Sequence, residues 1–166
     1  MLLSKCQPGI LIVLLTILLT PSLDTHASCW KDYPWGISES SAVKRDWVRT
    51  EVSSTIKSYL EVQRIDGGQI KVQYVFLNGS LVQISMTVYS IIISRERLAD
   101  MIWGSCFENL GPASTLGGAS NWMRKDLDTW AVAGIKNDLL FVLAEYIPAF
   151  STLIDAQTSG RLQLIY

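Results

Sequence analysis

Two carboxylates, Asp126 and Asp128, stand two residues apart just before Trp130. Acids paired beside an aromatic ring are typical of glycosidases, in which one carboxyl group acts as an acid and the other as a base. The same Asp-x-Asp spacing occurs in calcium loops, but no glycine and later glutamate complete such a loop here. The pair therefore gives one enzymatic hypothesis, a glycosidase-like carboxylate hydrolase. The simpler interpretation is a solvated approach to a strand.

The residue inventory argues against most other hydrolytic and metal chemistry. The single histidine, His26, lies in an N-terminal segment that we expect to be removed. Without an imidazole, serine and cysteine nucleophiles lose their usual base and zinc loses its commonest ligand. The spacings Ser41-x-x-Lys44 and Ser54-x-x-Lys57 fit a Ser–Lys pair, but no companion motif accompanies them. We therefore predict no catalytic residues, no metal and no cofactor.

The chain carries six tryptophans, a high load for its length. Aromatic rings at a surface bind sugars, lipids or protein partners. Trp47 and Trp130 fall on the buried side of predicted regular elements, so they are assigned to the core. The other four tryptophans lie in predicted loops or beside the apolar stripe of a helix, and they are the candidate binding aromatics: Trp30, Trp35, Trp103 and Trp122.

The N-terminal segment has the organisation of a secretory signal peptide. Lys5 supplies a positive charge, residues 10–19 are almost wholly apolar, and Thr25-His26-Ala27 places small residues before a cut after Ala27. As a helix, the apolar run would span about 15 Å, half of a membrane core, which argues against an anchor. We expect residues 1–27 to be a signal peptide and residues 28–166 to form one secreted, extracellular domain.

Two cysteines, Cys29 and Cys106, would remain after that cut. In an oxidising compartment a disulfide between them is the default expectation, and two buried free thiols are the alternative. Asn78-Gly79-Ser80 is an N-glycosylation sequon, and its other reading is simply a turn. The two readings are compatible, so Asn78 is a candidate glycosylation site.

The apolar periodicity predicts three helices and four strands. A helix over residues 40–62 is followed by strands at 70–76 and 82–88 and a second helix over 94–109. The order α-β-β-α-β-(α)-β is completed by a strand at 129–135, a short buried helix at 139–147 and a last strand at 162–166. This order predicts an α+β fold, a two-layer sandwich in which helices cover an antiparallel sheet.

Asn78-Gly79 between the first two strands predicts a hairpin. A two-residue loop would set Tyr74 opposite Gln83, a polar residue, whereas an odd-length loop pairs Tyr74 with Val82. Because one face of the hairpin must be buried, the pattern favours the odd-length loop.

The second half of the chain resembles a known group of proteins. Three features resemble the back half of small secreted fungal effectors of the killer-toxin-like α/β-sandwich group. They are a helix over 94–109 bearing Cys106, the glycine-rich stretch 111–118 and the run Trp130-Ala-Val-Ala-Gly134-Ile135. The likeness covers about residues 38–138, mostly as layout, and those families usually carry more cysteines. It implies a secreted protein that acts on a host or competitor, with no catalytic residues to carry over.

These observations favour a small, secreted, non-catalytic effector or toxin-like protein that binds a host or competitor protein or glycan through its surface. The net charge of −1 gives no sign of a nucleic-acid partner. The carboxylate hydrolase is one alternative, and a membrane-active toxin exposing residues 139–154 is another. Glu145 and Pro148 interrupt that apolar segment, and it is too short to span a bilayer, so membrane interaction is the less favoured reading.

Overall fold

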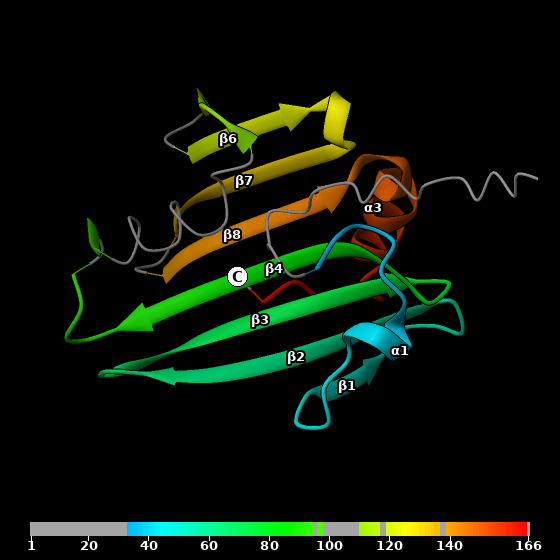
Figure 1. Cartoon of the computed structure of the whole chain (residues 1–166), viewed down its shortest axis with the longest axis horizontal. Coiled ribbons are helices and arrows are strands. Elements are labelled where there is room, and N and C mark those ends of the chain that lie inside the picture. Colours follow the sequence, from blue (N-terminus) through cyan, green and yellow to red (C-terminus); the bar gives the residue numbers. More distant parts are fainter. Residues whose placement is uncertain (1–32, 95, 98–109, 117–118, 137–138, 166) are drawn as a thin grey trace, which may run out of the picture.

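The structure, a computed structural model, describes residues 33–94, 96–97, 110–116, 119–136 and 139–165. These residues form one antiparallel sheet of eight strands in the order β1-β2-β3-β4-β8-β7-β6-β5 (Figure 1). Two meanders, β1–β4 and β5–β8, therefore meet where β4 pairs with β8. The strands are β1 Val48–Glu51, β2 Ile56–Ile65, β3 Gly68–Leu77, β4 Ser80–Ser90, β5 Ser114–Leu116, β6 Ala119–Arg124, β7 Thr129–Lys136 and β8 Leu139–Tyr146.

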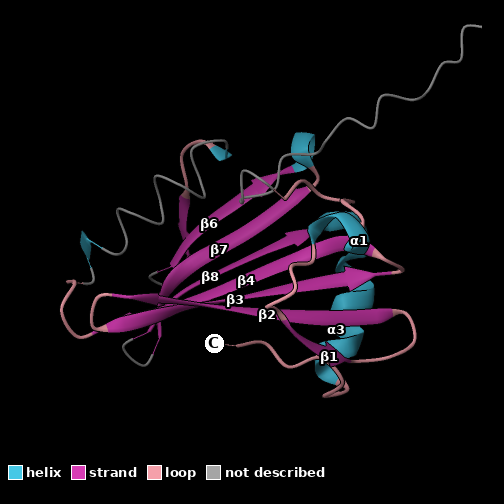
Figure 2. Cartoon of the chain, turned by 60° about the horizontal axis from the view of Figure 1, so that its bottom comes forward, coloured by secondary structure: helices cyan, strands magenta, loops and turns pink. Residues whose placement is uncertain are grey.

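The predicted α+β sandwich is wrong, because the described part of the chain is rich in strands and poor in helices. Its α-helices are α1 Glu39–Ala42 and α3 Phe150–Thr158, and short 3-10 turns occur at η2 Lys125–Leu127 and η3 Ile147–Ala149. Figure 2 shows the strands dominating the molecule, with α1 and α3 as small additions at one end. The fold is therefore a β-rich antiparallel sheet rather than a sheet covered by helices.

The helix predicted over residues 40–62 is replaced by α1, β1 and most of β2. Ser53 interrupts the segment, since its hydroxyl oxygen accepts hydrogen bonds from the backbone N–H groups of Thr55 and Ile56 in a tight turn. Trp47 and Ile56, which the prediction placed on one helical stripe, are buried in two different clusters. The helical spacing was accidental, and the alternation within 56–65 was the true signal.

The hairpin between β3 and β4 brings its apolar residues onto one face, but not through the odd-length loop that was predicted. Its loop has two residues, Asn78 and Gly79, both with positive φ, and Leu77 pairs with Ser80. A register shift at Val75/Phe76 then leaves Val82 unpaired, so Tyr74 lies opposite Ile84. The bulge, rather than an odd-length loop, brings the apolar residues onto one face.

The remaining predictions are partly confirmed. The strand at 129–135 is present as β7, whereas residues 139–146 form strand β8 instead of a helix. β8 lies between β4 and β7 and is buried on both faces, so its apolar run is continuous, as in other central strands. Residues 162–165 form no strand, and the helix predicted over 94–109 falls almost wholly outside the described residues.

Two hydrophobic clusters lie on opposite faces of the sheet. The first face, which carries Tyr74 and Ile84, is packed against an N-terminal segment that contributes Tyr33, Trp35 and Trp47. The second face carries both polar and apolar side chains and is covered at one end by α3 and the C-terminal segment, whose buried residues are Leu153, Ala156 and Leu162. Away from α3, several side chains of the second face are exposed.

Candidate functional site

Two of the four candidate binding aromatics are part of the core. Trp35 is 5% exposed, and its Nε1 donates a hydrogen bond to Thr129 Oγ1 at 2.7 Å. Trp122 is 3% exposed, and its Nε1 donates to the carbonyl oxygen of Gly111 at 3.0 Å. Neither ring is presented to a partner, so these two tryptophans supply no contact surface.

Several other predicted features fall on residues that the structure does not describe. These are the signal peptide at 1–27, the cysteines Cys29 and Cys106, and the tryptophans Trp30 and Trp103. The candidate glycosylation site can be placed, because Asn78 lies exposed at the tip of the β3–β4 turn. An oligosaccharide at Asn78 would project from the same end of the sheet as α1.

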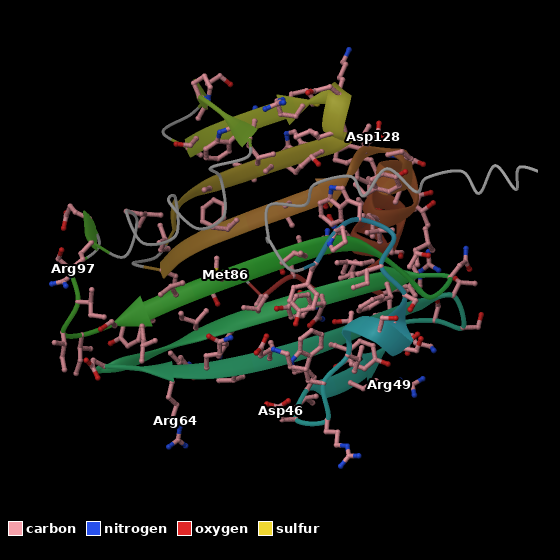
Figure 3. The ribbon with its side chains drawn as sticks, in the orientation of Figure 1. Asp46, Arg49, Arg64, Met86, Arg97 and Asp128 are labelled. Carbon is pink, nitrogen blue, oxygen red and sulfur yellow. The ribbon has the colours of Figure 1, made fainter. Side chains whose placement is uncertain are left out.

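The acid pair considered for glycosidase chemistry does not form a catalytic arrangement. The side chain of Asp126 is 64% exposed and receives two hydrogen bonds from Arg124, at 2.9 and 2.7 Å. The hydrogen bonds from Arg124 hold the pKa of Asp126 below its ordinary value, whereas a general acid needs a raised pKa. Asp128, labelled in Figure 3, ends η2 with a positive φ of 47°.

The apolar segment 139–154 is built into the body of the protein. Its strand residues Leu140, Val142 and Ala144 are buried in the cluster on the first face, and Leu153 of α3 is fully buried on the second. None of the helices in the described residues is long and apolar enough to cross a membrane.

A hydrogen-bonded group of polar side chains lies where α1 meets β2. Glu39 accepts hydrogen bonds from the hydroxyl group of Tyr59 and from Lys57 Nζ, the latter at 2.9 and 3.1 Å. The hydrogen bond from Tyr59, and then the contact with Lys57, hold the pKa of Glu39 below its ordinary value. This group borders a shallow, open depression of about 420 Å³, lined by Ser38, Glu39, Ser40, Val43, Tyr59 and Gly79. Because Lys57 neutralises Glu39, the depression offers no unbalanced charge to a ligand.

A second group of polar side chains lies farther along the same face of β2. Glu61 Oε2 accepts a hydrogen bond from the buried hydroxyl group of Tyr74 at 3.0 Å, and Glu61 Oε1 lies 3.6 Å from Lys44 Nζ. The ring of Trp47 stacks on Tyr74, with centroids 4.1 Å apart and planes 6° apart. These contacts attach the turn before β1 to the sheet, so Glu61 and Lys44 have a structural role.

A groove of about 330 Å³ separates the C-terminal segment from the second face. At its floor, Gln73 Nε2 donates to Ser58 Oγ and to the carbonyl oxygen of Gln163, and Ser85 Oγ donates to Gln73 Oε1. The amide of Gln73 is therefore occupied in holding the C-terminal segment against the sheet rather than in presenting donors to a ligand.

The feature that fits a contact surface is the outer edge of β2. β1 pairs only with Lys57–Leu60, so no described strand pairs with the outer edge of the remaining residues, Glu61–Ile65. Figure 1 shows β1 beside only one end of β2. We call residues 61–65 the open edge. The backbone turns away at Trp47, whose buried ring anchors the chain on the first face.

Basic and apolar side chains border the open edge on the second face. Val62 is 49% exposed and pairs across to Lys71, while Arg64 is exposed and pairs with Gln69. Tyr89, which is 44% exposed, follows on β4 opposite Gln69. We call Val62, Arg64, Lys71 and Tyr89 the edge patch. Figure 3 shows Arg64 projecting away from the ribbon.

The charge of the edge patch is unbalanced within the described residues. Arg64 and Lys71 are both cations, and no ion pair of either with a described residue is found. Glu61 lies on the opposite face, bonded to Tyr74, and Asp66 lies in the turn after β2. An acidic group placed against Arg64 and Lys71 would therefore gain two favourable interactions without displacing a described partner.

This surface is hidden when residues 40–62 are assigned to one helix. The alternation Leu60-Glu61-Val62-Gln63, followed by Asp66-Gly67-Gly68 and a second alternating run, is the signal of a hairpin. That reading would have put Val62, Arg64 and Lys71 on one face of neighbouring strands. It would not have shown that β1 covers only half of β2.

Comparisons with protein-family models, with curated proteins and with solved structures find no match to this chain.

Proposed function

We propose that this chain is a secreted, non-catalytic binding protein of effector or toxin type that contacts a host or competitor protein through the open edge of β2. The observation that carries the proposal is the pairing of β1 with only the first half of β2, which leaves Glu61–Ile65 beside the edge patch. An open, unprotected strand edge with exposed apolar side chains is a common protein-interaction surface.

The state of three described carboxylates, Glu39, Glu61 and Asp126, supports binding over turnover. Glu39 is paired with Lys57, Asp126 with Arg124, and Glu61 accepts a hydrogen bond from Tyr74. Each of these acids is held by a neighbour in a structural contact, and neither Asp126 nor Asp128 lines the depression at α1 or the groove under the C-terminal segment. The resemblance to killer-toxin-like effectors stays a prediction, as does the protein or glycan target it implies.

Secretion is tested on natural material. N-terminal sequencing should begin at Ser28, and the intact mass should be two hydrogens below that of the reduced chain if Cys29 and Cys106 are bridged. A sequence that begins at Met1 would contradict export with cleavage. Free thiols under denaturing, non-reducing conditions would contradict the bridge.

Binding is tested by photo-cross-linking from a defined position. The chain, secreted by its own host with p-benzoylphenylalanine in place of Gln63, is irradiated in the culture and in the presence of neighbouring cells. The proposal predicts a covalent adduct of discrete mass with a protein partner, because position 63 lies exposed in the middle of the open edge and its replacement keeps Arg64 and Lys71.

The matched control carries the same photoreactive residue in place of Lys125, an exposed cation of η2 in the other meander. An adduct from position 63 and none from position 125 supports the proposal. No adduct from position 63, or equal adducts from both positions, contradicts it.

A further inference from the structure

Building on the proposed function, we infer that the partner contributes an extended acidic segment that adds to the sheet as a strand along the open edge of β2. The proposal names both the binding mode and the chemistry of the partner. It rests on the unpaired half of β2 and on the uncompensated cations of the edge patch.

The open edge has the length that strand addition requires. Five residues of strand, Glu61–Ile65, span about 17 Å at about 3.3 Å per residue. All ten residues of β2 pair with β3, so alternate residues direct their backbone N–H and C=O groups to the opposite, outer edge. A partner strand would satisfy those groups and would continue the line of β1 along β2.

The edge patch determines which kind of strand fits. On the second face, Arg64 pairs with Gln69, and Lys71 lies in the adjacent row, opposite Val62. A carboxylate of the partner strand beside Arg64 would therefore meet that cation directly and would also lie in the field of Lys71, one row away. The exposed side chain of Val62 offers an apolar neighbour for the next partner residue on that face. The surface therefore suits a strand in which acidic and apolar residues share one face.

Pairing with a second copy of the chain is disfavoured by the same charges. In an antiparallel β2–β2 pair centred on Gln63, Arg64 of each copy would lie opposite Val62 of the other, and the two arginines would be diagonal neighbours on one face. Lys71 would flank them on each side. Four cations without a described acid would gather on that face, and their repulsion opposes a dimer.

The experiment measures amide hydrogen exchange of the secreted chain with three short capped peptides. The first alternates valine and glutamate, the second alternates valine and lysine, and the third is the first with every backbone amide N-methylated. The glutamate peptide should slow exchange at residues 61–65 and should bind at least about tenfold more tightly than the lysine peptide. The N-methylated peptide should give no protection, because it keeps the charge and loses the backbone donors.

Arg64→Glu tests whether the charge of the edge patch determines which peptide binds, with Lys125→Glu as the matched control. Arg64→Glu, which leaves one anion and one cation in the edge patch, should remove the preference for the glutamate peptide, and Lys125→Glu should leave it unchanged. Equal binding of the glutamate and lysine peptides to the parent chain, protection at residues outside 61–65, or equal protection by the N-methylated peptide would overturn the inference. Concentration-dependent protection without peptide would indicate self-pairing and would also overturn it.

The two proposals fail in different ways. If the photoreactive residue at position 63 captures a partner while the peptides give no protection at 61–65, the binding surface stands and strand addition is wrong. If position 63 captures nothing, the proposed function itself is contradicted, whatever the peptides do.

Discussion

Gln83 and Glu145 lie directly opposite each other across the seam between β4 and β8, and Gln83 Nε2 donates a hydrogen bond to Glu145 Oε1. Gln157 of α3 donates to the same oxygen at 3.3 Å. Both seam residues are almost completely buried, at 0% and 2% exposure. The carboxyl group therefore joins the two meanders and the helix that covers them.

Burial raises the pKa of Glu145 above its ordinary value, against the smaller opposing effect of the hydrogen bonds from Gln83 and Gln157. The folded protein then binds more protons than the unfolded chain once the pH exceeds the unfolded pKa of about 4.5. The stability contributed by the protonated group is complete below that pH. We therefore expect the unfolding free energy to fall as the pH rises from there to the folded pKa.

Glu145→Gln should remove this pH dependence. A neutral amide keeps the hydrogen-bonding shape, so the variant should be more stable than the parent at neutral pH by roughly 1–3 kcal/mol, because a buried charge is no longer formed. At pH 4 the two should be nearly equal. Urea unfolding at both pH values measures this, with Asp155→Asn, an exposed acid of α3, as the control. Parallel profiles for Glu145→Gln and its parent would show the idea to be wrong.

Trp35→Phe should destabilise the protein by about 2–4 kcal/mol. The substitution leaves a cavity in the core and removes the hydrogen bond that Trp35 Nε1 donates to the fully buried Thr129. Met123→Ala, which truncates a side chain that is 57% exposed, should change stability by no more than about 0.5 kcal/mol. Chemical denaturation compares them, and equal effects would mean that Trp35 does not anchor the N-terminal segment to β7.

Glycosylation at Asn78 is expected when the chain passes through a eukaryotic secretory pathway, because the residue is exposed in a two-residue turn. Ser80→Ala removes the sequon and leaves Asn78 in place, so the secreted product should lose the mass of one oligosaccharide. Ser80→Thr keeps the sequon and should keep that mass. Mass spectrometry decides, and masses that differ only by the substituted side chains would refute modification at this site.

The strands with clear alternation could be read from the sequence, and those at 70–76 and 82–88 were. Two features of the fold explain why the other strands were not predicted. The central strand β8 is buried on both faces, so Leu139–Tyr146 lacks the alternation that separates a strand from a buried helix. The spacing of Trp47 and Ile56 imitated a helical stripe although the two residues belong to clusters on opposite faces.

The candidate site depended on information that no local pattern contains. Arg64 and Lys71 are seven residues apart in sequence and reach one face only because the turn at Asp66-Gly67 sets the register of β2 and β3. The end of β1 pairing at Leu60 follows from the burial of Trp47 against Tyr74, a contact between distant residues. The location of these tryptophans in the core was likewise a tertiary effect, since Trp35 donates to the buried hydroxyl group of Thr129 and Trp122 to the carbonyl oxygen of Gly111.

The most direct test of the binding account is partner capture by the secreted chain after charge reversal at the edge patch. Arg64→Glu should reduce capture of the cross-linked partner by at least about tenfold, while Lys125→Glu, with the same change in net charge, should capture as much as the parent. Undiminished capture by Arg64→Glu, or an equal loss in both variants, would contradict binding at the open edge of β2.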